Sequence, residues 1–176
     1  MKKFLVVVDI QNDFVNGALG TREAEAIVDN AAKKISEFSG EIFVTLDTHF
    51  DNYMETGEGK RLPVPHCIKG TEGWELNSKI ASALLGHDFT TIEKITFGSV
   101  ELPKMIAASA KGEAFEITLI GLCTDICVVS NALLLKAHFP EANISVDAGC
   151  CAGVTVDSHC AALNTMKMCQ INIVNS

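Results

Sequence analysis

The stretch FEITLIGLCTDICVVSNALLLKAHF, residues 115–139, predicts a strand that turns directly into a helix. Residues 115–121 form an apolar run typical of a buried strand. Residues 124–139 are mostly apolar and end before Pro140, which stops a helix. Between them, the segment GLCTDICV places Cys123 and Cys127 at the junction. A strand followed at once by a helix is the repeating unit of a parallel sheet.

The rest of the chain repeats this alternation. The sequence predicts further strands at residues 4–9, 41–47, 89–94, 143–149 and 170–175, and helices at 21–40, 71–85, 99–110 and 155–168. Residues 48–70 are polar and aperiodic, which indicates a long loop. We therefore expect one α/β domain over residues 1–176, a Rossmann-like three-layer α/β/α sandwich with a six-stranded parallel sheet.

Composition excludes several classes of protein. The chain has 176 residues, of which 48% are hydrophobic, enough for one well-filled core. With 14 basic and 22 acidic residues the net charge is −8, which argues against a nucleic-acid partner. No apolar segment reaches the ~18–20 residues of a membrane span, and the run Phe4–Val8 is too short for a secretory signal. We expect a cytoplasmic protein without a membrane partner.

The seven cysteines are read as reduced thiols, because their number is odd and two of them are adjacent. If Thr124 caps the helix that follows, Cys127 occupies its third position, where the helix dipole lowers the pKa of a thiol. Cys127 is thus the candidate nucleophile, and Cys123 contributes its backbone. The alternative is that both are small buried hydrophobes.

Ionisable side chains also follow other predicted strands. Asp9 follows the first, Asp47 and His49 the second, and Lys94 ends the third. Ligands bind beyond this edge of a parallel sheet. Asp9 could take the proton of the Cys127 thiol, Lys94 could stabilise the thiolate, and the backbone N–H groups of Cys123 and Cys127 could form an oxyanion hole. The pattern indicates acyl transfer.

These residues lie in motifs that resemble a known family. The motifs are VVVDIQNDF (6–14), LDTH (46–49), LPVPHCIKGTEGWEL (62–76), EKITFGS (93–99) and GLCTDICV (121–128), in the family's order over most of the chain. The chain resembles the cysteine hydrolases of the isochorismatase-like superfamily, and within it the nicotinamidases. The resemblance implies that Asp9 is the catalytic acid and base, Lys94 the catalytic lysine and Cys127 the nucleophile. It also implies a cis peptide bond between Leu122 and Cys123, which turns the Cys123 N–H into the oxyanion hole.

For the substrate pocket, the resemblance implies Phe14, Gln11 and Leu122. Two positions depart from the pattern: Thr48 and Ile126 stand where nicotinamidases often have aromatic residues. These departures leave the catalytic residues intact and bear on the substrate.

The resemblance further implies a divalent metal held by Asp47, His49 and His66. Glu58 is a candidate fourth ligand, with Glu55 as its competitor. Imidazole and carboxylate ligands suit zinc, which we favour, as well as manganese or iron.

The function expected from the resemblance is metal-assisted hydrolysis of nicotinamide to nicotinate and ammonia, through a thioester on Cys127. The alternatives are hydrolysis of another small amide or carbamoyl compound, and an isochorismatase-like hydrolase. Outside these enzymes, a non-catalytic binding subunit and a thiol redox protein using Cys123 as the resolving cysteine stay open. The expected partners are a small-molecule amide and further copies of the chain, as a dimer or tetramer.

Overall fold

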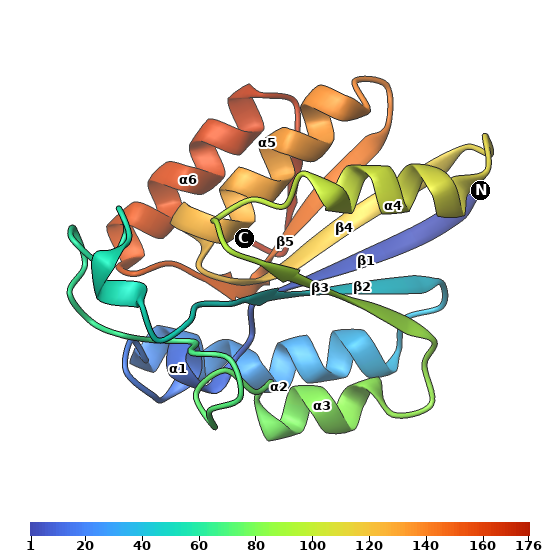
Figure 1. Cartoon of the computed structure of the whole chain (residues 1–176). Helices are drawn as coiled ribbons and strands as arrows, with labels where there is room; N and C mark the ends of the chain where they lie inside the picture. The colour runs from blue at the N-terminus through green and yellow to red at the C-terminus, as the bar shows by residue number, and fades with distance from the viewer.

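The computed structural model describes all 176 residues, and its centre is a six-stranded sheet (Figure 1). All strand pairs are parallel, in the order β3-β2-β1-β4-β5-β6. The strands are β1 (Lys2–Val8), β2 (Glu41–Asp47), β3 (Phe89–Lys94), β4 (Phe115–Leu122), β5 (Asn143–Ala152) and β6 (Asn172–Val174). The predicted six-stranded parallel sheet is confirmed.

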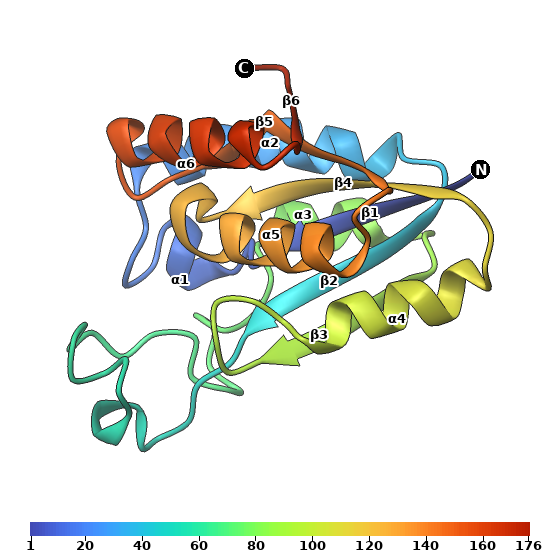
Figure 2. The ribbon, with the colours of Figure 1, turned by 90° about the horizontal axis from the view of Figure 1, so that it is seen from above.

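Helices cover both faces of the sheet, which makes three layers (Figures 1 and 2). One face carries α1 (Asn12–Val15), α2 (Arg22–Ser36) and α3 (Ser78–Leu84). The other carries α4 (Glu101–Ala110), α5 (Val129–His138) and α6 (Val156–Met168). None of these helices is both long enough and apolar enough to cross a membrane.

The central strand β1 shows why its sequence is a continuous apolar run. Phe4, Val6 and Val8 pack in the core cluster on the side of α4, α5 and α6. Leu5 and Val7 point to the opposite cluster, on the side of α1, α2 and α3. Because both faces are covered, the strand has no polar side.

The helix predicted at 21–40 ends at Ser36, and another predicted helix lacks its first half. The sequence predicts a helix over 71–85, but α3 begins only after Asn77, whose side chain accepts a hydrogen bond from the Lys79 N–H. The backbone before it pairs with the segment after β1 instead: Asn12 N–H donates to Glu75, and Asn77 N–H donates to Ile10. This long-range pairing overrides the local tendency to form a helix.

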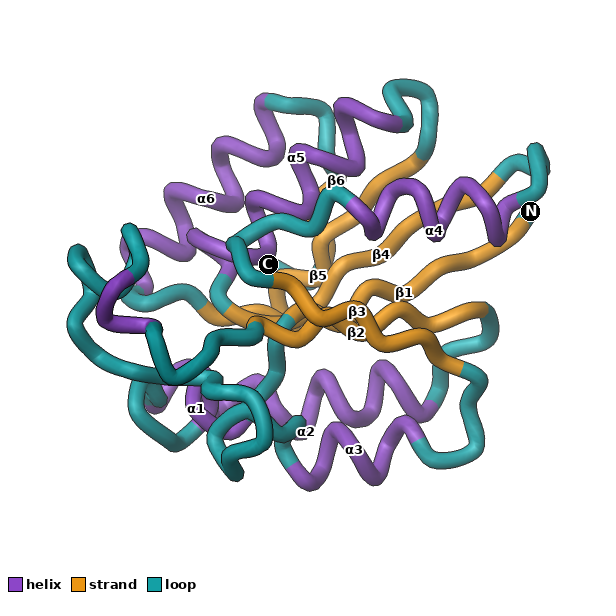
Figure 3. Tube along the Cα trace, in the orientation of Figure 1, coloured by secondary structure: helices purple, strands orange, loops and turns teal.

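The strand order positions a site at one edge of the sheet. The chain builds β1, β2 and β3 in one direction and then starts again at β4 on the other side of β1. Ligands bind at such a switch point, beyond the carboxyl ends of the strands. The long segment between β2 and α3 projects from this edge as loop, interrupted by one short 3-10 helix, Tyr53–Glu55 (Figure 3).

Candidate active site

Three residues, each at or beyond the end of a different strand, meet in a buried cluster. Asp9 follows β1, Lys94 is the last residue of β3, and Cys127 lies in a π-helical turn, Thr124–Val128, after β4. The Nζ of Lys94 lies 2.7 Å from Oδ2 of Asp9 and 3.6 Å from Sγ of Cys127. All three residues are buried. The structure therefore brings together the acid, the cation and the thiol that the sequence singled out.

The two oxygens of Asp9 have different surroundings. Oδ1 accepts a hydrogen bond of 2.7 Å from the Thr45 hydroxyl. Oδ2 forms the ion pair with Lys94 and has no hydrogen bond of favourable geometry. Burial raises the pKa of Asp9, an effect that the positive charge of Lys94 offsets only in part. The two oxygens are thus held differently, Oδ1 by a hydroxyl and Oδ2 by the Lys94 cation.

The pKa of the Cys127 thiol is raised well above its ordinary value, first by burial and then by the Asp9 carboxylate, while Lys94 lowers it only in part. The lowered thiol pKa expected from the helix dipole is wrong. Cys123, not Thr124, caps the turn, and the π-helical geometry puts Cys127 deep against the sheet. The raised pKa favours the protonated thiol, and Lys94 Nζ lies 3.6 Å from Sγ, where its charge can stabilise a thiolate.

The backbone before the turn is unusual. The Leu122–Cys123 peptide bond is cis, as the family resemblance implied. Gly121 before it has a φ of +125°, and a Cβ at this position would run into the carbonyl oxygen of Val8. Glycine is therefore required here. Cys123 borders the cavity, and its N–H donates to no protein acceptor.

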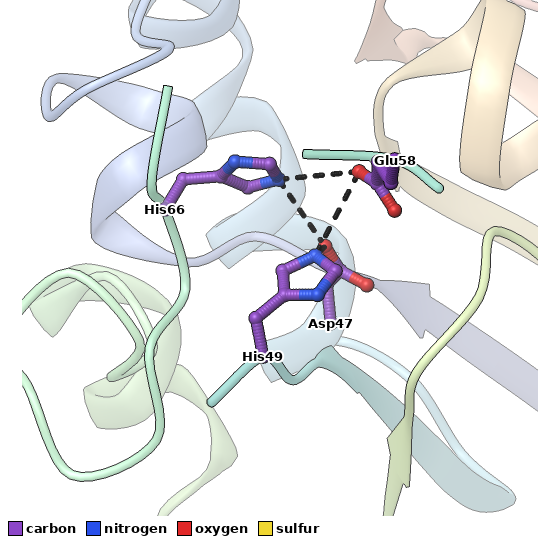
Figure 4. A group of neighbouring side chains, drawn as sticks. All are labelled: Asp47, His49, Glu58 and His66. Carbon is purple, nitrogen blue, oxygen red and sulfur yellow. Dashed lines mark hydrogen bonds and ion pairs between the residues drawn. The ribbon is translucent and has the colours of Figure 1, made fainter. Parts of the chain in front are cut away.

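Figure 4 shows a second cluster, which consists of four candidate metal ligands. One ligand atom from each of Asp47, His49, Glu58 and His66 lies within 4.8 Å of all the others. His66 Nε2 is 3.6 Å from both Asp47 Oδ2 and Glu58 Oε1. Atoms bound to one ion at about 2.0–2.2 Å are themselves roughly 3–3.5 Å apart, so the group fits a divalent metal after small shifts. Glu55 is exposed and lies outside the group.

The hydrogen bonds and charges around these four residues favour the binding of a cation. Nδ1 of His66 donates to the Val64 carbonyl at 2.8 Å, which leaves Nε2 to face the other ligands. Burial alone would raise the pKa of Asp47, but hydrogen bonds from His49 and His66 and the charge of Lys94 hold it well below its usual range. Lys94 Nζ lies 3.3 Å from Oδ1 of Asp47, so one lysine contacts both clusters.

Both clusters reach one cavity of about 790 Å³, the first of them through Cys127. Cys123 and Cys127 border it together with the four candidate metal ligands. Its apolar lining is formed by Phe14, Leu19, Phe50, Tyr53, Leu62, Ile95, Phe97 and Ile126. The ring of Phe14, a predicted pocket residue, packs at 5.5 Å against His66.

Two of the predicted pocket residues lie elsewhere. Gln11 is fully buried; its side chain accepts from the Asp47 N–H and donates to the Asp47 and Trp74 carbonyls, so it holds the backbone of a metal ligand. Leu122 packs in the core cluster beside α1, α2 and α3. Thr45 was not predicted as part of the site, because threonine is a common residue in strands. Asn131 was not predicted either, although a lone asparagine in VVSNALLL is a visible signal.

Comparison with known proteins finds nicotinamidases and pyrazinamidases among the proteins that this chain resembles. The nicotinamidase/pyrazinamidase of Mycobacterium tuberculosis is 26% identical over an alignment of 189 positions, which covers 98% of each chain. The crystal structure of nicotinamidase/pyrazinamidase PncA from Bacillus subtilis has a TM-score of 0.83 and 27% identity, covering 98% of this chain and 99% of that one. A Pyrococcus horikoshii pyrazinamidase, described in complex with zinc, has a TM-score of 0.79 and 23% identity over the full length of both chains. Since the profile of the isochorismatase domain matches residues 3–176, this chain belongs to the isochorismatase family.

Proposed function

We propose that this protein is a single-domain, metal-assisted cysteine amidohydrolase that converts nicotinamide to nicotinate and ammonia. The observation that carries the proposal is the meeting of the Asp9, Lys94 and Cys127 cluster with a four-ligand metal group on one cavity. The names of the relatives that are 26% and 27% identical support the same activity.

The first half of the reaction acylates the thiol. Sγ of Cys127 attacks the carboxamide carbon while its proton passes to Oδ2 of Asp9, the oxygen paired with Lys94. Lys94, 3.6 Å from Sγ, stabilises the developing thiolate. The free N–H of Cys123 is our candidate donor to the oxyanion, together with that of Cys127. Asp9 then gives its proton to the leaving nitrogen, ammonia departs, and a thioester remains.

The second half regenerates the enzyme. Asp9, again a carboxylate, takes a proton from a water molecule that attacks the thioester carbon. The carbon–sulfur bond breaks, the acid product forms, and the sulfur recovers its proton from Asp9. The raised pKa of Asp9 suits a group that both accepts and returns a proton.

Asp47, His49, Glu58 and His66 are the residues that would hold the metal ion. Two imidazoles and two carboxylates suit zinc, manganese or iron, and among these we propose zinc. A bound divalent ion supplies a Lewis acid that takes a lone pair of the substrate, such as that of a pyridine nitrogen.

Another small amide or carbamoyl compound is the second candidate. The cavity of about 790 Å³ exceeds what a single-ring amide fills, and Thr48 and Ile126 line it without aromatic rings. Hydrolysis of a vinyl ether, as in an isochorismatase, is less well supported because that reaction does not need the thiol present here.

The decisive experiment measures ammonia release from nicotinamide by protein of known metal content. We expect release that is lost on chelation and absent in Cys127→Ala. A folded, metal-loaded protein that releases no ammonia contradicts nicotinamide as substrate, and a panel of small amides and carbamoyl compounds then identifies the true one. Unchanged activity of Cys127→Ala contradicts the whole mechanism and supports a non-catalytic or different role for the thiol.

We further propose a cytoplasmic homo-oligomer, a dimer or tetramer. All seven cysteines are free, which suits a reducing compartment. Ile95 and Leu85 are 72% and 80% exposed and offer apolar surface that association would cover. Light scattering coupled to gel filtration measures the assembly directly, and a monomer at working concentration contradicts it.

A further inference from the structure

Asn131, on the first turn of α5, is fully buried and uses all of its side chain in hydrogen bonds. Its Oδ1 accepts from the Ser99 N–H at 2.9 Å. Its Nδ2 donates to the Phe97 carbonyl at 3.2 Å and to the Cys127 carbonyl at 2.8 Å. The three partners belong to two separate segments, the nucleophile turn and the 95–99 loop between β3 and α4.

The 95–99 loop is itself part of the site. It starts immediately after Lys94, and Ile95, Thr96 and Phe97 line the cavity. Ser99 is buried at its end, and its hydroxyl accepts from the Leu102 N–H in the first turn of α4. The loop runs against the beginning of α5 (Figure 1), so closely that a Cβ on Gly98 would lie 2.6 Å from Leu134 Cδ1.

These contacts close a ring. The 95–99 loop connects Lys94 to the partners of Asn131, the side chain of Asn131 donates to the Cys127 carbonyl, and Cys127 Sγ lies 3.6 Å from Lys94 Nζ. The distance between the Lys94 cation and the Cys127 thiol is therefore fixed by strand β3, which ends at Lys94, and by the side chain of Asn131, which holds the turn of Cys127. An error of about 1 Å in such a distance lowers a rate roughly 10²-fold.

We propose that Asn131 is a positioning residue within the function proposed above. Its bond to the Cys127 carbonyl holds the thiol near Lys94, and its other two bonds hold the 95–99 loop, which lines the cavity, near the thiol. Gln11 is its counterpart on the metal side. It is equally buried and also makes three hydrogen bonds, but these go to the backbone of Asp47 and Trp74. Two buried amides thus organise the two halves of the site separately.

The experiment compares three Asn131 variants. Asn131→Ala removes all three bonds, and Asn131→Asp keeps only the acceptor for Ser99. Asn131→Thr retains a hydroxyl that can bond the carbonyl four residues earlier, that of Cys127. The main readout is the second-order rate of Cys127 alkylation by iodoacetamide, measured by mass spectrometry of the peptide. This rate needs no substrate, so it tests the positioning role even if nicotinamide is not hydrolysed.

We expect Asn131→Ala and Asn131→Asp to change the alkylation rate at least about 10-fold and to lower kcat by about 10- to 100-fold. Asn131→Thr should keep the alkylation rate within about 3-fold of the unmodified protein while KM rises, because the thiol contact survives and the loop contacts do not. Gln11→Ala should do the reverse, with weaker metal binding and an alkylation rate within about 3-fold. Alkylation and kcat unchanged in Asn131→Asp overturn the proposal, as does an equal change of alkylation in Gln11→Ala.

Asp147→Asn controls for lost stability. Asp147 is buried on β5, away from the cavity, and binds Lys34 at 2.9 Å. We expect this variant to melt earlier without a change in alkylation rate or kcat. If it shows the same losses as Asn131→Asp at a matched melting temperature, the role of Asn131 is merely structural and the proposal fails.

Discussion

Replacing Lys94 by methionine keeps the length of the side chain and removes its charge from a site where Asp9 is fully buried. Breaking a buried ion pair from one side costs about 3–5 kcal/mol, because a charge is left without a partner. Asp9 can escape this cost by binding a proton. Starting from its ordinary pKa of 3.8, protonation at pH 7 costs about 4 kcal/mol, at about 1.4 kcal/mol per pKa unit. We therefore expect Lys94→Met to lose about 4 kcal/mol of unfolding free energy at pH 7.

The sign of the pH dependence follows from proton counting. In Lys94→Met the folded state holds a proton on Asp9 that the unfolded state releases above pH 3.8. The unfolding free energy therefore falls as the pH rises through and above this value. At pH 5 the loss should be below about 2 kcal/mol, at the same rate per pH unit. The double variant Asp9→Asn/Lys94→Met has no carboxylate to protonate, so it should exceed Lys94→Met in stability at pH 7.

The assay is urea unfolding of chelated protein at pH 5 and pH 7, followed by the fluorescence of the single tryptophan, Trp74. Comparing the single with the double variant cancels the titration of the histidines, which both retain. Equal stability of the two variants at pH 7, or a difference that does not shrink at pH 5, would refute the reasoning, because Asp9 would then not depend on Lys94 for its burial. Ammonia release should be lost in both variants.

Three further predictions concern the neighbours of this cluster. Glu58→Gln should weaken metal binding at least about 10-fold in a competitive chelator titration, whereas the exposed Glu55→Gln should not; equal effects would contradict the ligand assignment. Thr45→Val removes the hydrogen bond to Asp9 Oδ1 and should cost about 1–3 kcal/mol in urea unfolding and lower kcat, and full activity would show that Asp9 is oriented otherwise. Gly121→Ala should lose at least about 2 kcal/mol by thermal unfolding, and an unchanged melting temperature would contradict the contact with Val8.

The strands were predictable because burial on both faces of the sheet requires a continuous apolar run in the sequence. The bounds of β2 and β3 agree with the predicted 41–47 and 89–94. Strand β5 continues to Ala152, three residues past the prediction, because Cys151 and Ala152 pair with Gly121 and Leu122 of β4 beyond a register shift. The helix predicted at 71–85 failed because its first half pairs with a segment sixty residues away, and local sequence does not report such pairing.

For the site, residue types and strand ends were enough to name Asp9, Lys94 and Cys127, which the structure places together. The pKa direction of the thiol was not predictable, because a helix-dipole argument considers only the turn itself. Burial and the nearby carboxylate of Asp9, which follows β1, are properties of the assembled sheet. Gln11 was predicted to line the pocket and does not, for a related reason. A polar side chain beside a catalytic residue can hydrogen-bond the protein backbone as readily as a ligand.

The order of the strands also decides when, during synthesis, an active centre can exist. Once the chain has been made as far as Lys94, it contains the base, the cation and all four candidate metal ligands, within β1, β2, β3 and the segments that connect them. The thiol arrives only after β4 has paired with β1, through partners such as Lys2 and Phe115, roughly a hundred residues apart. Contacts of such long range form late in folding. A nascent chain can therefore gather its cation-binding half while it is still chemically inert, and reactivity begins with the closing of the sheet.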